Sequence, residues 1–174
     1  MIDDTLDRLM RDVPDFPKPG IVFKDITPLL ADAAALREVA SAMAEPWRDK
    51  GVTHILGVES RGFIFGTAVA MELGVGLVLV RKPGKLPCPS YGADYTLEYG
   101  TDRLEMHKDA LDESSRVVIL DDVLATGGTA GAVAELVAQG GGQLAGFGFL
   151  LELGFLSGRE KLPTDSVVES LRIL

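Results

Sequence analysis

The sequence predicts an α/β fold in which a central, mainly parallel sheet is flanked by helices. Residues 116–120 are largely apolar and rich in β-branched side chains, as is typical of a strand buried on both faces, and residues 129–139 then carry apolar side chains at helical spacing. The same order of buried run and helical pattern occurs earlier, at 53–58 and 61–73. With 174 residues, 47% of them hydrophobic, the chain can bury one core, so we expect a single domain over 1–174.

Prolines divide the region before the first predicted strand of the sheet. Residues 3–11 form a short amphipathic helical pattern, and 13–20 is a proline-rich connector that can be neither a helix nor a central strand. Residues 21–23 are predicted to be a brief extended segment. Residues 33–50 form a helical pattern in which we expect Pro46 to kink the helix or to mark its last turn. The regular alternation of strand and helix therefore begins after this region.

The remaining elements follow at regular intervals. Residues 75–80 are predicted to be the next strand. Residues 91–107 alternate apolar and polar side chains around Gly100, which predicts a β-hairpin or ribbon. The glycines at 140–142 end the last long helical pattern, and 143–150 is predicted to be the last core strand. No internal repeat and no linker divides this series into two domains.

Composition excludes several classes of protein. A net charge of −9 argues against nucleic acid as a general partner. No apolar run approaches the roughly 20 residues that cross a membrane, and the acidic start of the chain is unlike a signal peptide. The single cysteine fits a reducing compartment. We therefore expect a cytoplasmic protein that binds neither membranes nor nucleic acid.

A turn of small residues lies where the strand at 116–120 leads into the next helix, at the edge where open α/β sheets bind ligands. The turn consists of Ala125, Thr126, Gly127, Gly128 and Thr129. A ligand can approach such a backbone closely, and the amides of the first helical turn suit a phosphate dianion. The preceding carboxylates, Asp121 and Asp122, suit sugar hydroxyls or a hydrated magnesium ion. The residues therefore predict a site for a phosphorylated ribose. A P-loop is excluded, because no lysine follows the glycines.

Two more polar segments follow strands of the predicted sheet. The first is Glu59, Ser60 and Arg61, and the second is Arg81, Lys82 and Lys85. On the residues alone, the first is as well explained by a capping turn with Ser60 at the helix start as by a ligand site. The second is a basic loop in an acidic chain, which suits a polyanion, although a solvated charge run is the ordinary alternative.

The stretch Leu120-Asp121-Asp122, followed by Ala125-Thr126-Gly127-Gly128-Thr129, resembles the phosphoribosyl pyrophosphate-binding signature of the type I phosphoribosyltransferases. The resemblance implies that the turn holds the 5′-phosphate and that the two acids hold the ribose diol or a metal-bound water. Residues 59–61 are similar to the family's pyrophosphate loop, in which Arg61 would hold the leaving group and a cis bond is expected between Glu59 and Ser60. Residues 81–87 are similar to the family's basic loop, which adds Arg81, Lys82 and Lys85 to the pyrophosphate site.

Two other segments resemble one branch of this family, the adenine phosphoribosyltransferases. Residues 16–28 are similar to the hood that covers the base in these enzymes, around Val22, Phe23 and Lys24, although many members have arginine in place of Lys24. Residues 97–101 are similar to their catalytic lid. The resemblance assigns the proton chemistry to Glu98 and places Tyr99 in the lid.

The resemblance also implies how the chain is divided around the site. The hood is expected to comprise about residues 1–32 together with the C-terminal segment, and the lid about 83–107. Residues 151–162 are similar to a segment that approaches the base, and 167–174 are expected to close the hood.

The activity implied by the resemblance is transfer of the phosphoribosyl group from phosphoribosyl pyrophosphate to adenine, which gives AMP and pyrophosphate. Magnesium would be held mainly by the substrate, without a direct protein ligand, and the protein would be a homodimer. Two alternatives remain open. One is a phosphoribosyltransferase for xanthine, hypoxanthine or a pyrimidine. The other is a non-catalytic regulator that senses phosphoribosyl pyrophosphate.

Overall fold

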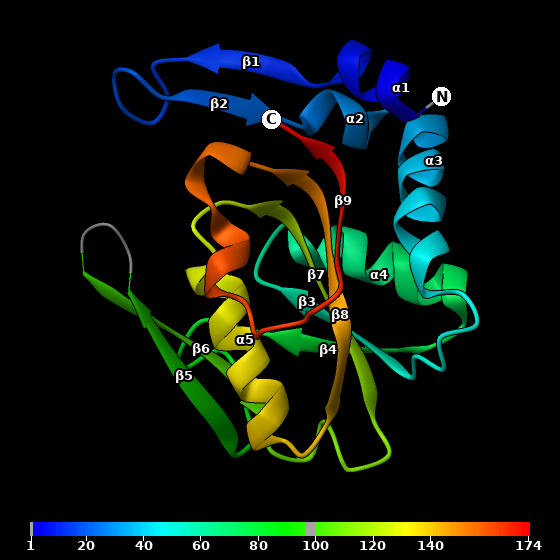
Figure 1. Cartoon of the computed structure of the whole chain (residues 1–174), viewed down its shortest axis with the longest axis vertical. Coiled ribbons are helices and arrows are strands. Elements are labelled where there is room, and N and C mark those ends of the chain that lie inside the picture. The colour runs from blue at the N-terminus through cyan, green and yellow to red at the C-terminus, as the bar shows by residue number, and fades with distance from the viewer. Residues whose placement is uncertain (1, 97–99) are drawn as a thin grey trace.

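The computed structural model describes residues 2–96 and 100–174 and contains a five-stranded parallel sheet at its centre (Figure 1). The elements are α1 (Ile2–Leu9), β1 (Arg11–Pro14), β2 (Val22–Asp25), α2 (Thr27–Ala31), α3 (Ala33–Ala44), the 3-10 turn η1 (Glu45–Trp47), β3 (His54–Val58), α4 (Gly62–Leu73), β4 (Gly76–Val80), β5 (Ser90–Thr96), β6 (Thr101–His107), β7 (Arg116–Leu124), α5 (Gly128–Gln139), β8 (Gln143–Glu152), η2 (Gly154–Leu156), η3 (Gly158–Lys161) and β9 (Val168–Ile173). The order of strands in the sheet is β4-β3-β7-β8-β9, and all neighbours are parallel. The predicted fold class is confirmed.

Apolar side chains on both faces of the sheet explain its burial. Along β7, Val117 and Ile119 point into one core with α5 and the β5–β6 ribbon, whereas Val118 and Leu120 point into another with α3 and α4. All four are fully buried. Because successive side chains of a strand alternate between its faces, a continuous apolar run is the pattern that two covered faces require. Figure 1 shows the helices on the two sides of the sheet.

The strand order of the sheet changes direction between the neighbouring strands β3 and β7. From β3 the chain passes through α4 to β4 on one side, and from β7 it passes through α5 to β8 on the other. The connections that follow these two parallel strands therefore lead to opposite sides and leave a crevice at the carboxyl ends of the strands. Ligands of open α/β sheets bind in such a crevice. The segments that follow β3 and β7 therefore meet at one place.

The N-terminal region forms a layer of its own at the carboxyl end of the sheet (Figure 1). β1 and β2 form an antiparallel pair, in which Val13 lies opposite Phe23. β1 and α2 were not predicted, because both are short and depend on contacts with distant residues. The helix over 33–50 ends earlier than its pattern, since α3 stops at Ala44 and Pro46 lies in the 3-10 turn that follows.

Two strands differ from the sequence prediction. β7 continues through the two acids to Leu124, because β8 provides partners for this extension, with Val123 opposite Leu151. The C-terminal segment, expected in the hood, instead pairs with β8 as the outer strand β9. It still reaches the N-terminal region, since Arg172 donates hydrogen bonds to Asp3 and Asp7 of α1. No helix in the described ranges combines the length and the apolar character needed to cross a bilayer.

Candidate functional site

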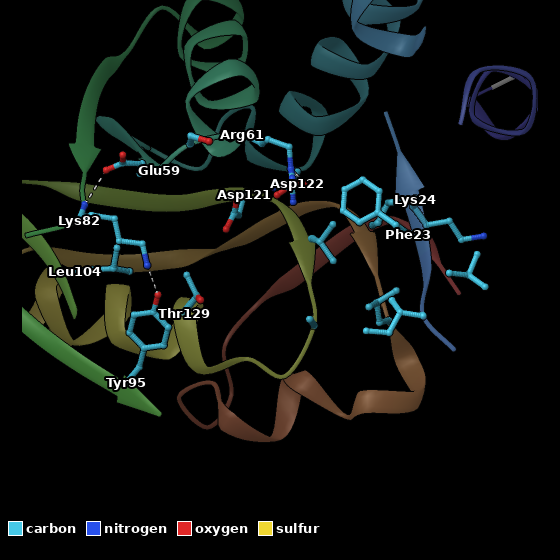
Figure 2. Close-up of a pocket in the computed structure, with 17 residues that line it drawn as sticks. Phe23, Lys24, Glu59, Arg61, Lys82, Tyr95, Leu104, Asp121, Asp122 and Thr129 are labelled. Atoms are coloured by element: carbon cyan, nitrogen blue, oxygen red, sulfur yellow. Dashed lines mark hydrogen bonds and ion pairs between the residues drawn. The ribbon is translucent and has the colours of Figure 1, made fainter. Parts of the chain in front are cut away.

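A cavity of about 510 Å³ lies at the crevice between β3 and β7. Side chains from the hood, the loops after β3 and β4, the end of β7, the start of α5 and the end of β8 line it (Figure 2). Most of the predicted site residues are among its walls. They are Val22, Phe23, Lys24, Glu59, Ser60, Arg61, Lys82, Asp121, Asp122, Ala125 and Thr129.

The predicted phosphate turn joins β7 to α5 on one side of the cavity. Gly127 has a φ of 81°, which favours glycine, and it immediately precedes the helix. Among the described residues, no side chain caps this helix start, so its first-turn amides are available to an anion. Ala125 and Thr129 line the cavity. The turn therefore has the geometry of a phosphate cradle.

The acid pair lies on β7 itself rather than in the turn. The Asp122 amide donates to Oδ1 of Asp121 over 2.8 Å, and the Asp122 side chain is almost fully buried. Burial, and then the negative charge of Asp122, raise the pKa of Asp121 well above its ordinary value. Two adjacent carboxylates thus face the cavity in an environment that opposes a second negative charge.

Arg61 connects the acid pair with the hood. Its Nε donates to Oδ2 of Asp122, and its guanidinium carbon lies 5.7 Å from the centre of the Phe23 ring. The Glu59–Ser60 peptide bond is cis, as the resemblance implied. Arg61, not Ser60, is the residue that precedes α4, and it makes no side-chain cap. The alternative of a capping turn with Ser60 at the helix start is therefore wrong.

The basic loop is bound to a carboxylate from the neighbouring loop. Glu59 accepts hydrogen bonds from the Lys82 amide over 2.8 Å and from Nζ of Lys85 over 2.6 Å, and it lies 3.5 Å from Nε of Arg81. Burial alone would raise the pKa of Glu59, but the hydrogen bonds from Lys85 and Lys82 lower it overall. Of the three cations, only Lys82 lines the cavity. Arg81 and Lys85 are not among its lining residues, so their role as pyrophosphate ligands stays a prediction.

Two residues of the β5–β6 ribbon complete this side of the site and were missed by the sequence analysis. Nζ of Lys82 donates to the Tyr95 hydroxyl over 2.7 Å and to Oδ2 of Asp102 (Figure 2 labels Tyr95 and Lys82). Tyr95 and Asp102 are directly opposite each other in the ribbon. Burial would lower the pKa of Lys82, but the bonds to Asp102 and Tyr95 raise it overall. The alternation at 91–107 predicted the ribbon, but it predicted neither this pairing nor the lysine partner.

The hood forms the opposite wall. Phe23 faces the cavity and packs edge-on against Phe16 at 5.3 Å between ring centres. Lys24 also contributes to the wall, but its ammonium group bonds Asp12 at 2.6 Å and points away from the cavity (Figure 2). Its charge is therefore neutralised outside the site.

The end of β8 and the residue after it contribute apolar walls, whereas the approach of residues 151–162 to the base stays a prediction. Leu151 and Leu153 line the cavity. A planar base placed between Phe23 and these side chains would be held by apolar contacts on both sides. Glu98 and Tyr99, the predicted catalytic and lid residues, lie outside the described residues.

Comparison with known proteins agrees with this geometry. The model of the phosphoribosyl transferase domain family matches residues 25–168. An adenine phosphoribosyltransferase of Acaryochloris marina is 55% identical over 91% of this chain and 93% of its own length. The structure of the enzyme of that name from Thermoanaerobacter pseudethanolicus has a TM-score of 0.95 at 48% identity and covers 100% of both chains. One from Saccharomyces cerevisiae, in complex with adenine and an imino-altritol bisphosphate, has a TM-score of 0.92 at 40% identity over 98% of both chains.

The family match spans the acid pair, the phosphate turn and the basic loop, and the structural match spans the hood as well. The chain therefore belongs to the phosphoribosyl transferase domain family and, within it, to the adenine phosphoribosyltransferases.

Proposed function

We propose that this protein transfers the phosphoribosyl group of phosphoribosyl pyrophosphate to adenine and releases AMP and pyrophosphate, a purine salvage reaction. The observation that carries the proposal is that one cavity unites a phosphate cradle, an acid pair, two cationic side chains and an aromatic hood. A related enzyme from Trypanosoma brucei, 29% identical with a TM-score of 0.90, has been crystallised with AMP, pyrophosphate and ribose 5-phosphate. This set of ligands matches the groups that the cavity offers.

In the reaction, the bond between the anomeric carbon and the pyrophosphate oxygen breaks, and its electron pair leaves with pyrophosphate. A ring nitrogen of adenine bonds to the anomeric carbon and loses its proton. The amides of Ala125–Thr129 hold the 5′-phosphate, and Asp121 and Asp122 hold the ribose hydroxyls. Because the donor is fixed at both ends while Phe23 covers the base, much of the rate comes from positioning.

Negative charge grows on the leaving pyrophosphate, and Arg61 and Lys82 are placed to stabilise it. Each is paired with a carboxylate in this structure, Arg61 with Asp122 and Lys82 with Asp102. The donor must therefore exchange these contacts for its own when it binds. Glu59 holds the remaining cations of the basic loop nearby and so sets the position of the Lys82 backbone.

Magnesium is the cofactor that we propose. The fit rests on Asp121 and Asp122: burial, and then the negative charge of Asp122, raise the pKa of Asp121, and a cation near the pair would offset the second of these effects. Among the described residues, no three side chains of the types that bind metals converge, so the pyrophosphate oxygens would supply most of the ligands. Bound magnesium would neutralise charge on the leaving group.

The first test is AMP formation from purified protein, magnesium and phosphoribosyl pyrophosphate, with adenine, hypoxanthine, guanine, xanthine and uracil offered separately. We expect a nucleoside monophosphate with adenine alone. If another base gives product, the proposed donor site stands, but the proposed role of the hood in binding adenine is wrong. If the protein binds phosphoribosyl pyrophosphate but forms no product with any base, the result would support a non-catalytic regulator instead.

The role of Glu98 is tested by Glu98→Gln. If Glu98 receives the proton that adenine loses, the amide cannot replace it, and kcat should fall at least about 100-fold, the lower range for a general base. Binding of phosphoribosyl pyrophosphate should not change. The matched control is Glu113→Gln, at an exposed position on the turn before β7. An unchanged kcat in Glu98→Gln would remove Glu98 from the mechanism.

We further propose that two copies associate and that the protein works in the cytoplasm. The large apolar side chains exposed on α4 and β4, among them Ile64, Met71 and Leu79, support association. The exposed free thiol of Cys88 supports a reducing compartment. Sedimentation equilibrium tests the first proposal, and fractionation of the source cells tests the second.

A further inference from the structure

The phosphate turn is in direct backbone contact with a segment from the far end of the chain. A Cβ atom on Gly127 would lie 2.1 Å from the carbonyl oxygen of Gly158, and a Cβ on Gly158 would lie 2.2 Å from the carbonyl oxygen of Ala125. Neither distance leaves room for a side chain. The two glycines therefore allow the turn and the start of η3 to pack backbone against backbone.

The contact continues along η3, which we call the buttress (Gly158–Lys161). The Cβ of Lys161 would lie 3.1 Å from a Cβ on Gly127, and the Lys161 carbonyl oxygen would lie 3.2 Å from a Cβ on Gly131, in the first turn of α5. The buttress thus covers the outer side of the turn whose inner side faces the cavity. Any outward movement of the turn requires the buttress to move too.

One ion pair fixes the buttress to the sheet. Nε and Nη2 of Arg159 donate to the two carboxylate oxygens of Glu152, each over 2.7 Å. The Ser170 hydroxyl on β9 donates to the same carboxylate over 2.7 Å. Glu152 is 5% exposed and ends β8, directly opposite Leu124, the last residue of β7 before the turn.

The pair with Arg159 favours the charged form of Glu152. Hydrogen bonds from Arg159 are the largest effect on the pKa of Glu152 and keep it below its ordinary value, despite burial. A two-bonded arginine–carboxylate pair also fixes orientation, which a single contact would not. None of the four residues Glu152, Gly158, Arg159 and Ser170 lines the cavity. Gly158 touches the turn directly, and Arg159 acts on it through the buttress.

We propose that Arg159 is a positioning residue for the 5′-phosphate site: by holding the buttress on Glu152, it keeps Gly158 against Gly127 and so fixes the amides of the phosphate turn. The inference rests on the proposed function in one respect, that the turn binds a sugar 5-phosphate. It predicts that loss of Arg159 weakens binding of the sugar phosphate but not binding of pyrophosphate. The residues proposed to bind pyrophosphate, Arg61 and Lys82, belong to other loops. Their positions do not depend on the buttress.

The test compares two partial ligands by isothermal titration calorimetry, ribose 5-phosphate and pyrophosphate with magnesium. Arg159→Ala should weaken ribose 5-phosphate about tenfold and leave the pyrophosphate affinity within about twofold. In the complete reaction, KM for phosphoribosyl pyrophosphate should rise about tenfold, with a smaller change in kcat. Arg159→Lys should recover part of the affinity, since lysine can make one of the two bonds.

Two further variants make the result decisive. Gly158→Ala keeps the ion pair but places a methyl group against the Ala125 carbonyl, at a residue without a positive φ, so it should produce the same selective loss. If Arg159→Ala does not fold, the binding of ribose 5-phosphate by Gly158→Ala still tests the proposal. Arg48→Ala is the matched control, because it removes another paired arginine, bonded to Glu45 and Glu72 far from the turn, and should change neither affinity.

Normal ribose 5-phosphate binding in Arg159→Ala or in Gly158→Ala would overturn the proposal. So would an equal loss of both ligands, which would indicate general destabilisation. Failure of the proposed function is a separate outcome, since it would appear as absence of AMP formation by the unmodified protein. The binding comparison does not depend on that assay.

Discussion

At the scale of single residues, Asp121 shows a conflict between stability and ligand binding. Its carboxylate is half-buried beside Asp122, and burial, followed by the negative charge of Asp122, raises its pKa. A raised pKa in an acid means that the charged form is less stable in the folded protein than in the unfolded chain. The cost therefore appears as the pH rises through the ordinary pKa and is complete above the folded-state pKa.

Asp121→Asn should accordingly stabilise the unliganded protein, by about 1 kcal/mol at pH 8 and by less at pH 4. The amide keeps an oxygen that can accept the Asp122 amide bond. The same change should weaken binding of phosphoribosyl pyrophosphate, because a ribose ligand is lost. Urea denaturation at both pH values checks the first statement and calorimetry the second. A variant that is less stable than the original at pH 8 would contradict this account.

Lys82 shows a competition between the chain and the ligand. Its ammonium group is bound by Asp102, whose side chain is about one-third exposed, so the pair contributes modestly. Pyrophosphate must compete with that carboxylate for Lys82. Asp102→Asn should therefore bind pyrophosphate about threefold more tightly, as expected for removing roughly 0.6 kcal/mol of competing attraction.

Asp94→Asn is the control for this prediction. Asp94 lies on the same ribbon and is paired with Arg103 rather than Lys82. Calorimetry with magnesium and pyrophosphate should show no change in the control. Weaker binding in Asp102→Asn would mean that Asp102 orients Lys82 for the ligand instead of competing with it.

At the scale of elements, the hood is attached to the rest of the molecule through α1. Leu6 of α1 is fully buried in the core that contains α3 and α4, and Thr5 donates to Glu38 of α3 over 2.6 Å. Arg172 of β9 bonds two carboxylates on the same helix. Because α1 leads directly into β1, its packing helps to hold the hood, together with Ile26 and Leu29, which follow β2 and are buried in the same core.

Leu6→Ala should lower the free energy of unfolding by about 3 kcal/mol, the middle of the range for a buried leucine, and should also raise KM for adenine. KM for phosphoribosyl pyrophosphate should change less, because the donor contacts lie on other elements. Val167→Ala, at a side chain that is 50% exposed, should change stability by less than about 0.5 kcal/mol. Equal effects on both KM values would mean that α1 supports the whole site rather than the hood.

Long periodic elements were predicted well from the sequence, whereas short ones were not. The strands at 53–58 and 143–150 were found within a few residues, because their burial requires a continuous apolar run. The strand at 75–80 was found as well, although it lies at the edge of the sheet and is only partly buried. β1 is exposed along most of its length, so no local pattern identifies it. β7 exceeds its apolar run because β8 provides its hydrogen-bond partners, which local sequence does not reveal.

At the scale of the whole molecule, paired carboxylates make the fold sensitive to acid. In the part of the chain that the structure describes, six carboxylates have a pKa below the ordinary value because hydrogen bonds or nearby cations favour their charged form; they are Asp25, Asp32, Glu59, Asp102, Asp112 and Glu152. A lowered folded-state pKa contributes stability above the ordinary pKa, and this is lost as the pH falls through the folded value. Asp121 acts in the opposite direction.

The unfolding reaction should therefore take up protons below about pH 5, and stability should decline steadily toward pH 2, where Asp25 titrates with a pKa of about 2. Urea denaturation at intervals of half a pH unit, at constant ionic strength, measures this slope. A free energy of unfolding that stays constant or rises between pH 5 and pH 3 would show that these contacts do not contribute.

The sequence by itself determined the fold class and the presence of a turn of small residues, preceded by two acids, between a buried strand and a helix. These features depend on residues close together in the chain, where strand, turn and helix propensities act directly. The tertiary structure alone decided that Arg61 pairs with Asp122, that Lys82 pairs with Tyr95 and Asp102, and that Arg159 supports the turn through Glu152. Each pairing joins side chains from separate elements, and their distance and burial are set by how the sheet brings those elements together.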